Sequence, residues 1–172
     1  MLIVLTGESG SGKTTLCARL AAELQARGRD VAGVLTLPRF DNGEKIGMEV
    51  ADLRTGARVA LAERAAPGAG TAALRWRFDD AALAHGERIL RAAVPCDVLV
   101  VDELGPLELI HQQGWCVAFD LLTAQQYRHA LVVVRPHLVE HLSARVRMEM
   151  HLVTVTPLNR EEMFYHVLAL VS

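Results

Sequence analysis

Short apolar runs alternate along this chain with amphipathic stretches. The apolar, β-branched run 1–6 precedes residues 14–27, where Leu16, Leu20 and Leu24 recur at helical spacing. Further strands are predicted for the apolar runs 31–37, 97–103, 130–134 and 151–155. Further helices are expected at 79–93, 115–128, 136–147 and 159–170. Strands that alternate with helices imply a largely parallel sheet with helices on both faces, the α/β class.

The alternation is interrupted at about residues 40–61. Asn42-Gly43 is a hairpin-turn signal, and a second turn separates the apolar segments 46–53 and 58–61. This pattern predicts a small antiparallel β insert. The glycine-rich and alanine-rich stretch 65–71 that follows is expected to be a mobile loop.

Two aromatic residues, Trp76 and Phe78, directly precede Asp79, the expected cap of the next helix. Their position is typical of a hydrophobic staple, in which they pack against the first helical turn. The alternative is a platform on which a base stacks.

Composition predicts one domain over residues 1–172. A chain of 172 residues with 51% hydrophobic residues is long and apolar enough to bury one core. The formal net charge of −2 gives no overall basic surface for nucleic acid. Three cysteines without Cys-x-x-Cys spacing are expected to be reduced thiols, and no apolar run approaches the roughly 18 residues of a membrane span. We therefore expect a soluble, cytoplasmic protein.

The segment Gly7-Glu-Ser-Gly-Ser-Gly-Lys-Thr-Thr15 matches the phosphate-binding pattern G-x-x-x-x-G-K-[ST] at every fixed position. Its glycines let successive backbone amides point at one anion. A predicted strand precedes the loop and a predicted helix follows it, so the helix N-terminus adds its positive dipole end to the same site. The sequence therefore predicts a nucleoside-triphosphate site.

Charge and reach assign roles within this loop. Lys13 is expected to bridge the β- and γ-phosphates, and the Thr14 hydroxyl to coordinate Mg²⁺. Thr15 is expected near the α-phosphate. The remaining loop residues that we predict to contact ATP or GTP are Gly7, Glu8, Ser9, Gly10, Ser11 and Gly12. Glu8 and Ser9 occupy variable positions of the pattern and are equally well explained as exposed loop residues.

The strand 97–103 ends in two adjacent acids, Asp102 and Glu103. A carboxylate at the carboxyl end of a buried strand is placed to hold the water shell of Mg²⁺, so Asp102 is the predicted metal-site residue. Its neighbour Glu103 is the predicted general base that polarises the attacking water. The alternative for Glu103 is an acid that caps a loop or helix.

Four further residues are candidates for the site. Arg135 ends a strand and is a candidate arginine finger supplied within the chain, and Arg39 is a second candidate for contact with the γ-phosphate. Glu108 is a candidate for orienting the nucleophile or for binding the outer shell of the metal. Asn159 is a candidate for contact with the base, although Asn before two glutamates is also a good helix N-cap.

Four segments together resemble the nucleotide-kinase-like nucleoside-triphosphatases first described from thermophiles. They are the loop 7–15, residues 33–39 with 47–56, the stretch 102–109, and residues 154–160. The resemblance implies a three-layer P-loop domain that hydrolyses ATP, GTP and other triphosphates slowly with Mg²⁺. The chain departs from the family pattern at Leu37-Pro38, where a more polar segment usually precedes the arginine.

Three functions fit these features. The first is hydrolysis of the γ-phosphate by water, and the second is transfer of that phosphoryl group to a small acceptor or nucleotide. The third is a binding module gated by the bound nucleotide. The sequence leaves open the acceptor, the base preference, whether the chain is a monomer or a weak oligomer, and whether the Asp102 strand adjoins the first strand.

Overall fold

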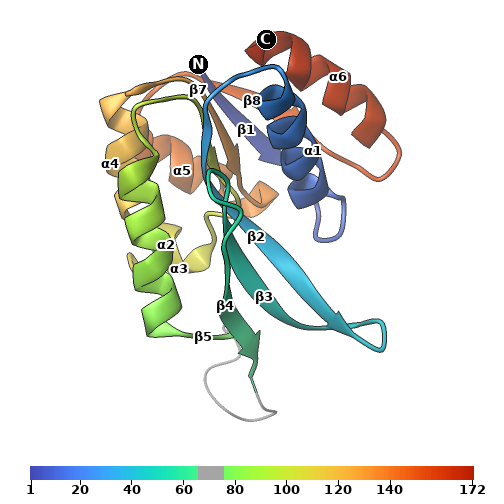
Figure 1. Cartoon of the computed structure of the whole chain (residues 1–172), viewed down its shortest axis with the longest axis vertical. Helices are drawn as coiled ribbons and strands as arrows, with labels where there is room; N and C mark the ends of the chain where they lie inside the picture. Colours follow the sequence, from blue (N-terminus) through green and yellow to red (C-terminus); the bar gives the residue numbers. More distant parts are fainter. Residues whose placement is uncertain (66–75) are drawn as a thin grey trace.

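One eight-stranded sheet lies between two layers of helices (Figure 1). The computed structural model describes residues 1–65 and 76–172. Apart from Ala65, the predicted mobile loop at 65–71 lies outside the described residues. The three-layer α/β architecture expected from the alternating pattern is confirmed.

The sheet is parallel on one side and antiparallel on the other. Its order is β5-β4-β3-β2-β6-β7-β1-β8, with parallel pairing from β2 to β8 and antiparallel pairing from β5 to β2. The strands are β1 (Leu2–Thr6), β2 (Val31–Asp41), β3 (Glu44–Asp52), β4 (Arg58–Arg64), β5 (Trp76–Phe78), β6 (Cys96–Val101), β7 (Tyr127–Val133) and β8 (Met150–Thr154).

Each face of the sheet buries its own apolar core. Helices α1 and α6 cover one face, and α2, α4 and α5 cover the other (Figure 1). The α-helices are α1 (Lys13–Ala26), α2 (Asp80–Ala93), α3 (Pro106–Leu109), α4 (Val117–Ala124), α5 (Val139–Val146) and α6 (Arg160–Val171). Leu16, Leu20 and Leu24 are fully buried on α1, as their helical spacing predicts.

Strand β7 lies between β1 and β6, which answers the question of strand order. The Asp102 strand is therefore separated from the first strand by one additional strand. Because these three strands are parallel, their carboxyl ends meet at one edge of the sheet. The P-loop, the two acids after β6 and Arg135 after β7 all lie at that edge.

The antiparallel insert is larger than predicted. β2 runs on to Asp41, and its pairing with β3 already begins at Val34, so the insert continues the main sheet. The hairpin turn at Asn42-Gly43 is confirmed, with φ angles of 48° and 82°. Trp76 and Phe78 form a short strand that pairs with β4, which adds β5 to the sheet.

The predicted helix 115–128 is wrong at its end. α4 ends at Ala124 because Gln125 adopts the left-handed conformation, with φ 51°. Tyr127 then enters β7 opposite Cys96, three residues before the strand was expected. The predicted helix 136–147 starts as a 3₁₀ turn, Pro136–Leu138, and continues as α5.

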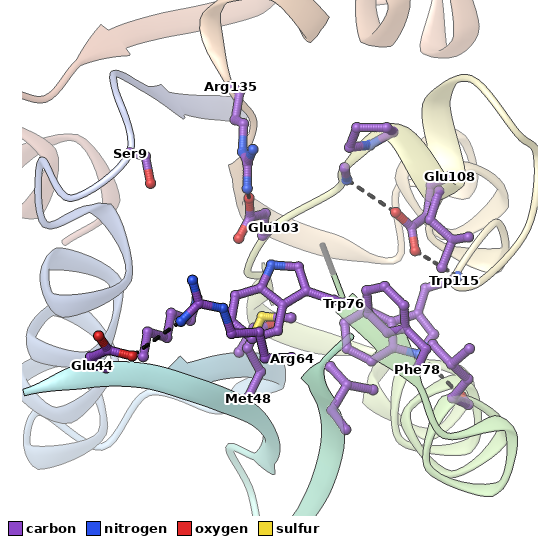
Figure 2. Close-up of a pocket in the computed structure, with 17 residues that line it drawn as sticks. Ser9, Glu44, Met48, Arg64, Trp76, Phe78, Glu103, Glu108, Trp115 and Arg135 are labelled. Carbon is purple, nitrogen blue, oxygen red and sulfur yellow. Dashed lines mark hydrogen bonds and ion pairs between the residues drawn. The ribbon is translucent and has the colours of Figure 1, made fainter. Parts of the chain in front are cut away.

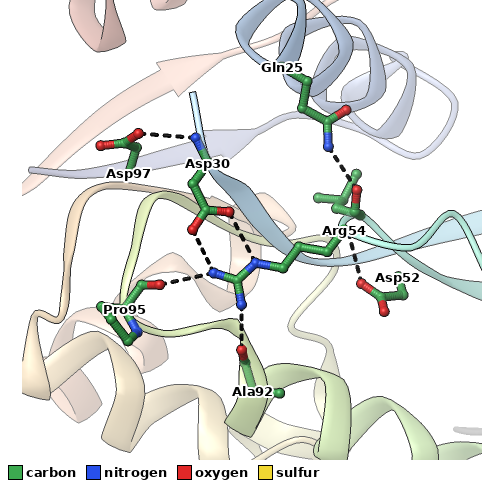
Figure 3. A network of polar contacts seen from close by, with 8 residues as sticks. Gln25, Asp30, Asp52, Arg54, Ala92, Pro95 and Asp97 are labelled. Carbon is green, nitrogen blue, oxygen red and sulfur yellow. Dashed lines mark hydrogen bonds and ion pairs between the residues drawn. The ribbon is translucent and has the colours of Figure 1, made fainter. Parts of the chain in front are cut away.

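Arg54 joins three segments at the amino-terminal ends of β2 and β6 (Figure 3). Its guanidinium forms a bidentate pair with Asp30, at 2.7 and 3.0 Å, just before β2. It also donates to the carbonyl oxygens of Ala92, in the last turn of α2, and of Pro95. Since carbonyls at a helix C-terminus lack partners within the helix, Arg54 satisfies groups that would otherwise need water.

Candidate functional site

The P-loop is a tight turn between β1 and α1. Gly7 has a φ of 144°, and a Cβ atom there would overlap the carbonyl oxygen of Val155. At Gly12 φ is 93°, and a Cβ would lie 2.6 Å from Nη1 of Arg160. Both positions need glycine for backbone conformation, and Gly7 needs it also for space, because its neighbour is a backbone carbonyl whereas that of Gly12 is a flexible side chain.

The ammonium group of Lys13 is folded into the loop. Its Nζ donates to the carbonyl oxygens of Gly7 and Glu8, at 2.6 and 2.7 Å, and to Oγ of Ser11 at 3.3 Å. Burial lowers the pKa of Lys13, and the nearby Glu103 and Asp102 partly offset this. The charge thus sits in the cradle where a phosphate would bind, held only by neutral partners.

Thr14 lies against Asp102, as the metal-site prediction requires. The threonine hydroxyl donates to Oδ1 of Asp102 at 3.2 Å, and the Thr36 amide donates to Oδ2 at 3.1 Å. Asp102 is fully buried, and burial raises its pKa to about 7. Hydroxyl and carboxylate oxygens are ligands that Mg²⁺ prefers. A buried carboxylate beside a hydroxyl is chemically suited to a cation brought in by the phosphates.

Glu103 pairs with Arg135, which approaches it from β7. Both Nε and Nη2 of Arg135 lie 2.8 Å from Oε1 of Glu103. The second carboxylate oxygen, Oε2, has no hydrogen-bond partner among residues 1–65 and 76–172. Glu103 has a φ of 72°, a conformation rare for residues other than glycine, so its side chain is directed by a constrained backbone.

A cavity of about 740 Å³ opens beside this ion pair (Figure 2). Ser9 of the P-loop, Thr36, Glu103 and Arg135 line its polar end. The other walls combine apolar residues with charged groups of β3 and β4. These lining residues are Glu44, Lys45, Met48, Leu61, Arg64, Trp76, Phe78, Leu83, Gly105, Pro106, Leu107, Glu108 and Trp115.

The sequence of the chain matches the family model described as NTPase over residues 2–168. The chain belongs to the NTPase family. This match covers both the P-loop and the acidic pair, so family membership and site geometry concern the same residues. The P-loop fold expected from the resemblance is confirmed.

Two relatives named as nucleoside-triphosphatases match 94% and 62% of this chain. A nucleoside-triphosphatase THEP1 of Methanosarcina acetivorans is 30% identical over 163 residues, covering 94% of this chain and 91% of that protein. THEP1 of Methanopyrus kandleri is 38% identical over 107 residues, or 62% of this chain and 59% of that protein. The solution structure of a human cancer-related nucleoside triphosphatase has a TM-score of 0.71 at 24% identity, covering 99% and 96% of the two chains.

The remaining candidates lie apart from the phosphate cradle of this NTPase-family chain. Arg39 is on the hairpin, 3.8 Å from Glu49, and does not line the cavity. Both carboxylate oxygens of Glu108 accept backbone amides, from Gly105 and Trp115, so this acid fixes the loop after β6. Arg135 is accordingly the candidate finger that the structure places beside the acidic pair.

Asn159 directly precedes α6, but its side chain does not cap the helix. Its Oδ1 accepts the amide of Thr156 at 2.7 Å, and its Nδ2 donates to the carbonyl of Thr154 at 3.0 Å. These bonds hold the β8–α6 loop, so a contact between Asn159 and the base stays a prediction. Its neighbour Arg160 borders the P-loop at Gly12.

Sequence reasoning missed Lys45. This residue lines the cavity from β3, and its Nζ lies 5.0 Å from the centroid of the Trp76 ring. Nothing in the local sequence marks it, because it follows Glu44 in a charged hairpin tip. Trp115 was also missed as a cavity wall, since it reads as the start of an amphipathic helix.

Within the described ranges, no helix has both the length and the apolar character needed to cross a membrane. Cys17, Cys96 and Cys116 are free thiols, and burial raises the pKa of each.

Proposed function

We propose that this protein hydrolyses nucleoside 5'-triphosphates to diphosphate and phosphate, with Mg²⁺ and with little preference for the base. One observation carries the proposal: the fold brings Thr14 of the P-loop into hydrogen-bond contact with Asp102, so that Lys13 and Glu103, their neighbours in the chain, belong to the same site. Family membership supports the same reaction, because the matching family is that of NTPases.

Binding of the triphosphate begins at the loop. The amides of residues 10–13 and the N-terminus of α1 would face the β-phosphate, for which the Ser11 amide would leave its bond to the carbonyl of Glu8. Lys13 would exchange its contacts with loop carbonyls for phosphate oxygens. This exchange replaces neutral acceptors with anionic ones, for which a partly desolvated ammonium has a higher affinity.

Thr14 and Asp102 would hold Mg²⁺, which supplies positive charge to the β- and γ-phosphate oxygens when bound. Glu103 would activate the attacking water. Its free oxygen Oε2 accepts a proton from the attacking water, while Arg135 fixes Oε1 and thereby the direction of the carboxylate. Because Arg135 is already engaged with Glu103, it offers less charge to the transferring phosphoryl group, and we expect slow turnover.

Several finer points belong to the proposal. Broad base use fits a site in which the contacts that we predict are with the phosphates, apart from Asn159 as the candidate near the base. We place the protein in the cytoplasm, where reduced thiols such as these three cysteines persist. We expect a monomer or a weak oligomer.

The test is release of free phosphate from ATP, GTP, CTP and UTP with and without Mg²⁺. We expect Mg²⁺-dependent release from all four and a loss of about 10²-fold or more for Lys13→Ala, since the lysine contacts the charge that develops on the phosphates. Glu103→Gln should bind nucleotide normally but hydrolyse it at least about 10²-fold more slowly in a single turnover.

Two results would contradict this proposal. Near-parental hydrolysis by folded Lys13→Ala would show that the P-loop is not the active site. Near-parental hydrolysis by Glu103→Gln would make Glu103 structural and place the base elsewhere. Circular dichroism of each variant shows whether it is folded, and Arg88→Ala, an exposed change on α2, controls for the substitution itself.

A further inference from the structure

The cavity beside Glu103 is larger than hydrolysis needs. A water molecule occupies about 30 Å³ of liquid volume, whereas this cavity has about 740 Å³, within the range of sites for small organic molecules. The nucleotide does not account for the difference. Of the P-loop residues only Ser9 lines the cavity, and neither Asn159 nor Arg160 does. The cavity therefore meets the nucleotide site at the γ-phosphate end only.

The wall away from the P-loop is built for a flat apolar group. Phe78, Leu83 and Trp115 line the cavity together with Trp76, and Figure 2 shows Trp115 and Phe78 at the far end from Ser9, with Trp76 nearer to Glu103. Trp115 is 2% exposed, and its indole nitrogen donates to the carbonyl of Leu83 at 3.0 Å, so this ring is fixed before any ligand arrives. Aromatic side chains favour planar rings through offset or edge contacts.

Charges inside the cavity are mostly paired. Glu103 pairs with Arg135, Glu44 pairs with Arg64 at 3.2 Å, and Glu108 is held by backbone amides. The cation that remains is Lys45, which forms no ion pair or hydrogen bond with the described residues and lies over the Trp76 ring. Among the cavity's carboxylate oxygens, Oε2 of Glu103 and Oε1 of Glu44 accept no hydrogen bond from the described residues, and Glu103 is the acid that lies at the polar end with Ser9. The cavity thus combines an apolar slot with a free carboxylate oxygen of Glu103 at its polar end and the cation of Lys45.

We infer that this cavity binds a planar aromatic or heteroaromatic alcohol and presents its hydroxyl group to Glu103 as a phosphoryl acceptor. The inference rests on the proposed function, because the donor is the nucleoside triphosphate on the P-loop. The hydroxyl oxygen forms a bond to the γ-phosphorus, and its proton passes to Oε2 of Glu103. The bond from the γ-phosphorus to the β,γ-bridging oxygen breaks, and the diphosphate leaves with that electron pair. The products are a phosphate monoester and a nucleoside diphosphate.

This reaction and hydrolysis use the same atoms. With the cavity empty, water takes the place of the hydroxyl group, which makes hydrolysis the slow default. With a ring in the apolar slot, the alcohol oxygen is held at the attack position, and positioning of this kind can accelerate a reaction by several orders of magnitude.

The two tryptophans of the chain both line the cavity, so tryptophan fluorescence reports ligand binding directly. The probes are benzyl alcohol, 3-pyridinemethanol and uridine. We expect each to shift the emission with a Kd of about 0.1–5 mM, as befits small ligands. Cyclohexylmethanol, which has the hydroxyl but no planar ring, should bind at least about tenfold more weakly than benzyl alcohol.

Variants locate the binding. Trp76→Ala should weaken ring binding about tenfold or more, with Trp115 still reporting. Arg77→Ala is the matched control, because this exposed neighbour on β5 does not line the cavity. Trp76→Phe keeps a planar wall and should restore most of the affinity. If Arg77→Ala and Trp76→Ala weaken binding equally, the ring lies elsewhere.

Transfer is measured with ATP labelled in the γ-phosphate, separating free phosphate from phosphate ester. At saturating alcohol we expect ester to form at least about tenfold faster than phosphate is released without alcohol. Toluene and 3-picoline, rings without a hydroxyl group, should bind and yield no ester. Binding of the alcohols without ester formation, or no binding by any of the three, would overturn the inference.

Failure of the inference is distinguishable from failure of the proposed function. Lys13→Ala should lose both ester and free phosphate while it retains ring binding by fluorescence. A parental protein that releases phosphate but neither binds nor phosphorylates the alcohols keeps the proposed function and loses this one. A parental protein that forms ester yet releases no phosphate keeps this inference and loses the proposed function.

Discussion

At the scale of single residues, the site depends on groups that are held by their neighbours before any ligand binds. Asp102 is buried between Thr14 and Thr36, and Glu103 is fixed by Arg135. These arrangements cost stability, because buried carboxylates and rare backbone conformations are unfavourable by themselves. Their cost can be measured.

Asp102 should make the metal-free protein less stable as the pH rises. Burial raises its pKa to about 7, so between its ordinary value and pH 7 the folded state keeps a proton that the unfolded state releases. The stability that this proton provides is fully present below the unfolded pKa and is lost as the pH rises through the folded pKa. Asp102→Asn, which cannot ionise, should lose this pH dependence and be more stable than the parent by about 1–3 kcal/mol near pH 8.

Urea denaturation at about pH 5 and pH 8, without metal or nucleotide, measures the effect. The same variant should need more Mg²⁺ for hydrolysis, because a carboxylate ligand is gone. An Asp102→Asn protein that is equally destabilised at both pH values would mean that burial does not govern this carboxylate. Asp97→Asn, half-buried in the strand β6 that precedes Asp102, is the control for replacing an acid in this segment.

Arg135 should act through Glu103. Arg135→Ala removes both bonds to Oε1, and we expect turnover to fall about 10²-fold because the carboxylate loses its direction. If orientation is the whole effect, Arg135→Ala should add little in the background of Glu103→Gln, and Arg135→Lys should restore little because lysine lacks the planar fork. Single-turnover hydrolysis by the parent, the two single variants Arg135→Ala and Glu103→Gln, and the double variant gives the coupling energy between the two residues. Fully additive losses would instead make Arg135 an independent finger on the phosphate.

At the scale of elements, the parallel sheet depends on connections that hold its helices in place. Arg54 lies in the turn between β3 and β4, yet it binds the last turn of α2 and the residue before β2 (Figure 3). A turn of the antiparallel part thus secures a helix of the parallel part. The insert and the main sheet are therefore joined by side-chain contacts as well as by the strand β2 that they share.

Arg54→Ala should lower the free energy of unfolding by about 1–2 kcal/mol. The substitution removes two hydrogen bonds from the carboxylate of Asp30 and leaves the carbonyls of Ala92 and Pro95 to bond with water. Chemical denaturation measures this loss. Arg58→Ala, on the exposed start of β4, is the matched control and should change stability by less than about 0.5 kcal/mol. Equal losses in the two variants would show that the Arg54 contacts contribute nothing specific.

At the scale of the whole molecule, nucleotide binding should stabilise the fold, because the site joins β1, β6 and α1 at one edge of the sheet. With Mg²⁺ and a non-hydrolysable triphosphate at about 100 times its Kd, the gain should be about 2.7 kcal/mol. Thermal unfolding shows it as a higher midpoint. Lys13→Ala should lose most of the gain, and an unchanged midpoint in the parent would argue against a triphosphate site.

Much of the fold follows from local patterns. The helix 79–93 begins where Asp79 was expected to cap it, and the side chain of Asp79 accepts the amide of Ala82 at 2.8 Å. The glycine after α1, Gly28, has the positive φ of a helix C-cap, 76°. The end of α4 was not predictable in this way, because Gln125 carries no signal for the left-handed conformation that stops the helix. Tertiary pairing of Tyr127 with Cys96 decides that boundary.

The sequence by itself determined the phosphate loop and the two acids, Asp102 and Glu103, that follow β6. A glycine loop followed by a helix has its chemistry in consecutive residues, so backbone geometry alone orients the amides, Lys13 and Thr14. The acids after β6 were also identifiable, because a buried strand that ends in Asp102 must place it at the sheet edge. Tertiary structure decided everything that joins distant segments. The strand order β6-β7-β1 sets Arg135 on Glu103, and the meeting of β3, β5 and the loop after β6 makes the cavity, because such contacts depend on pairing between residues far apart in the chain.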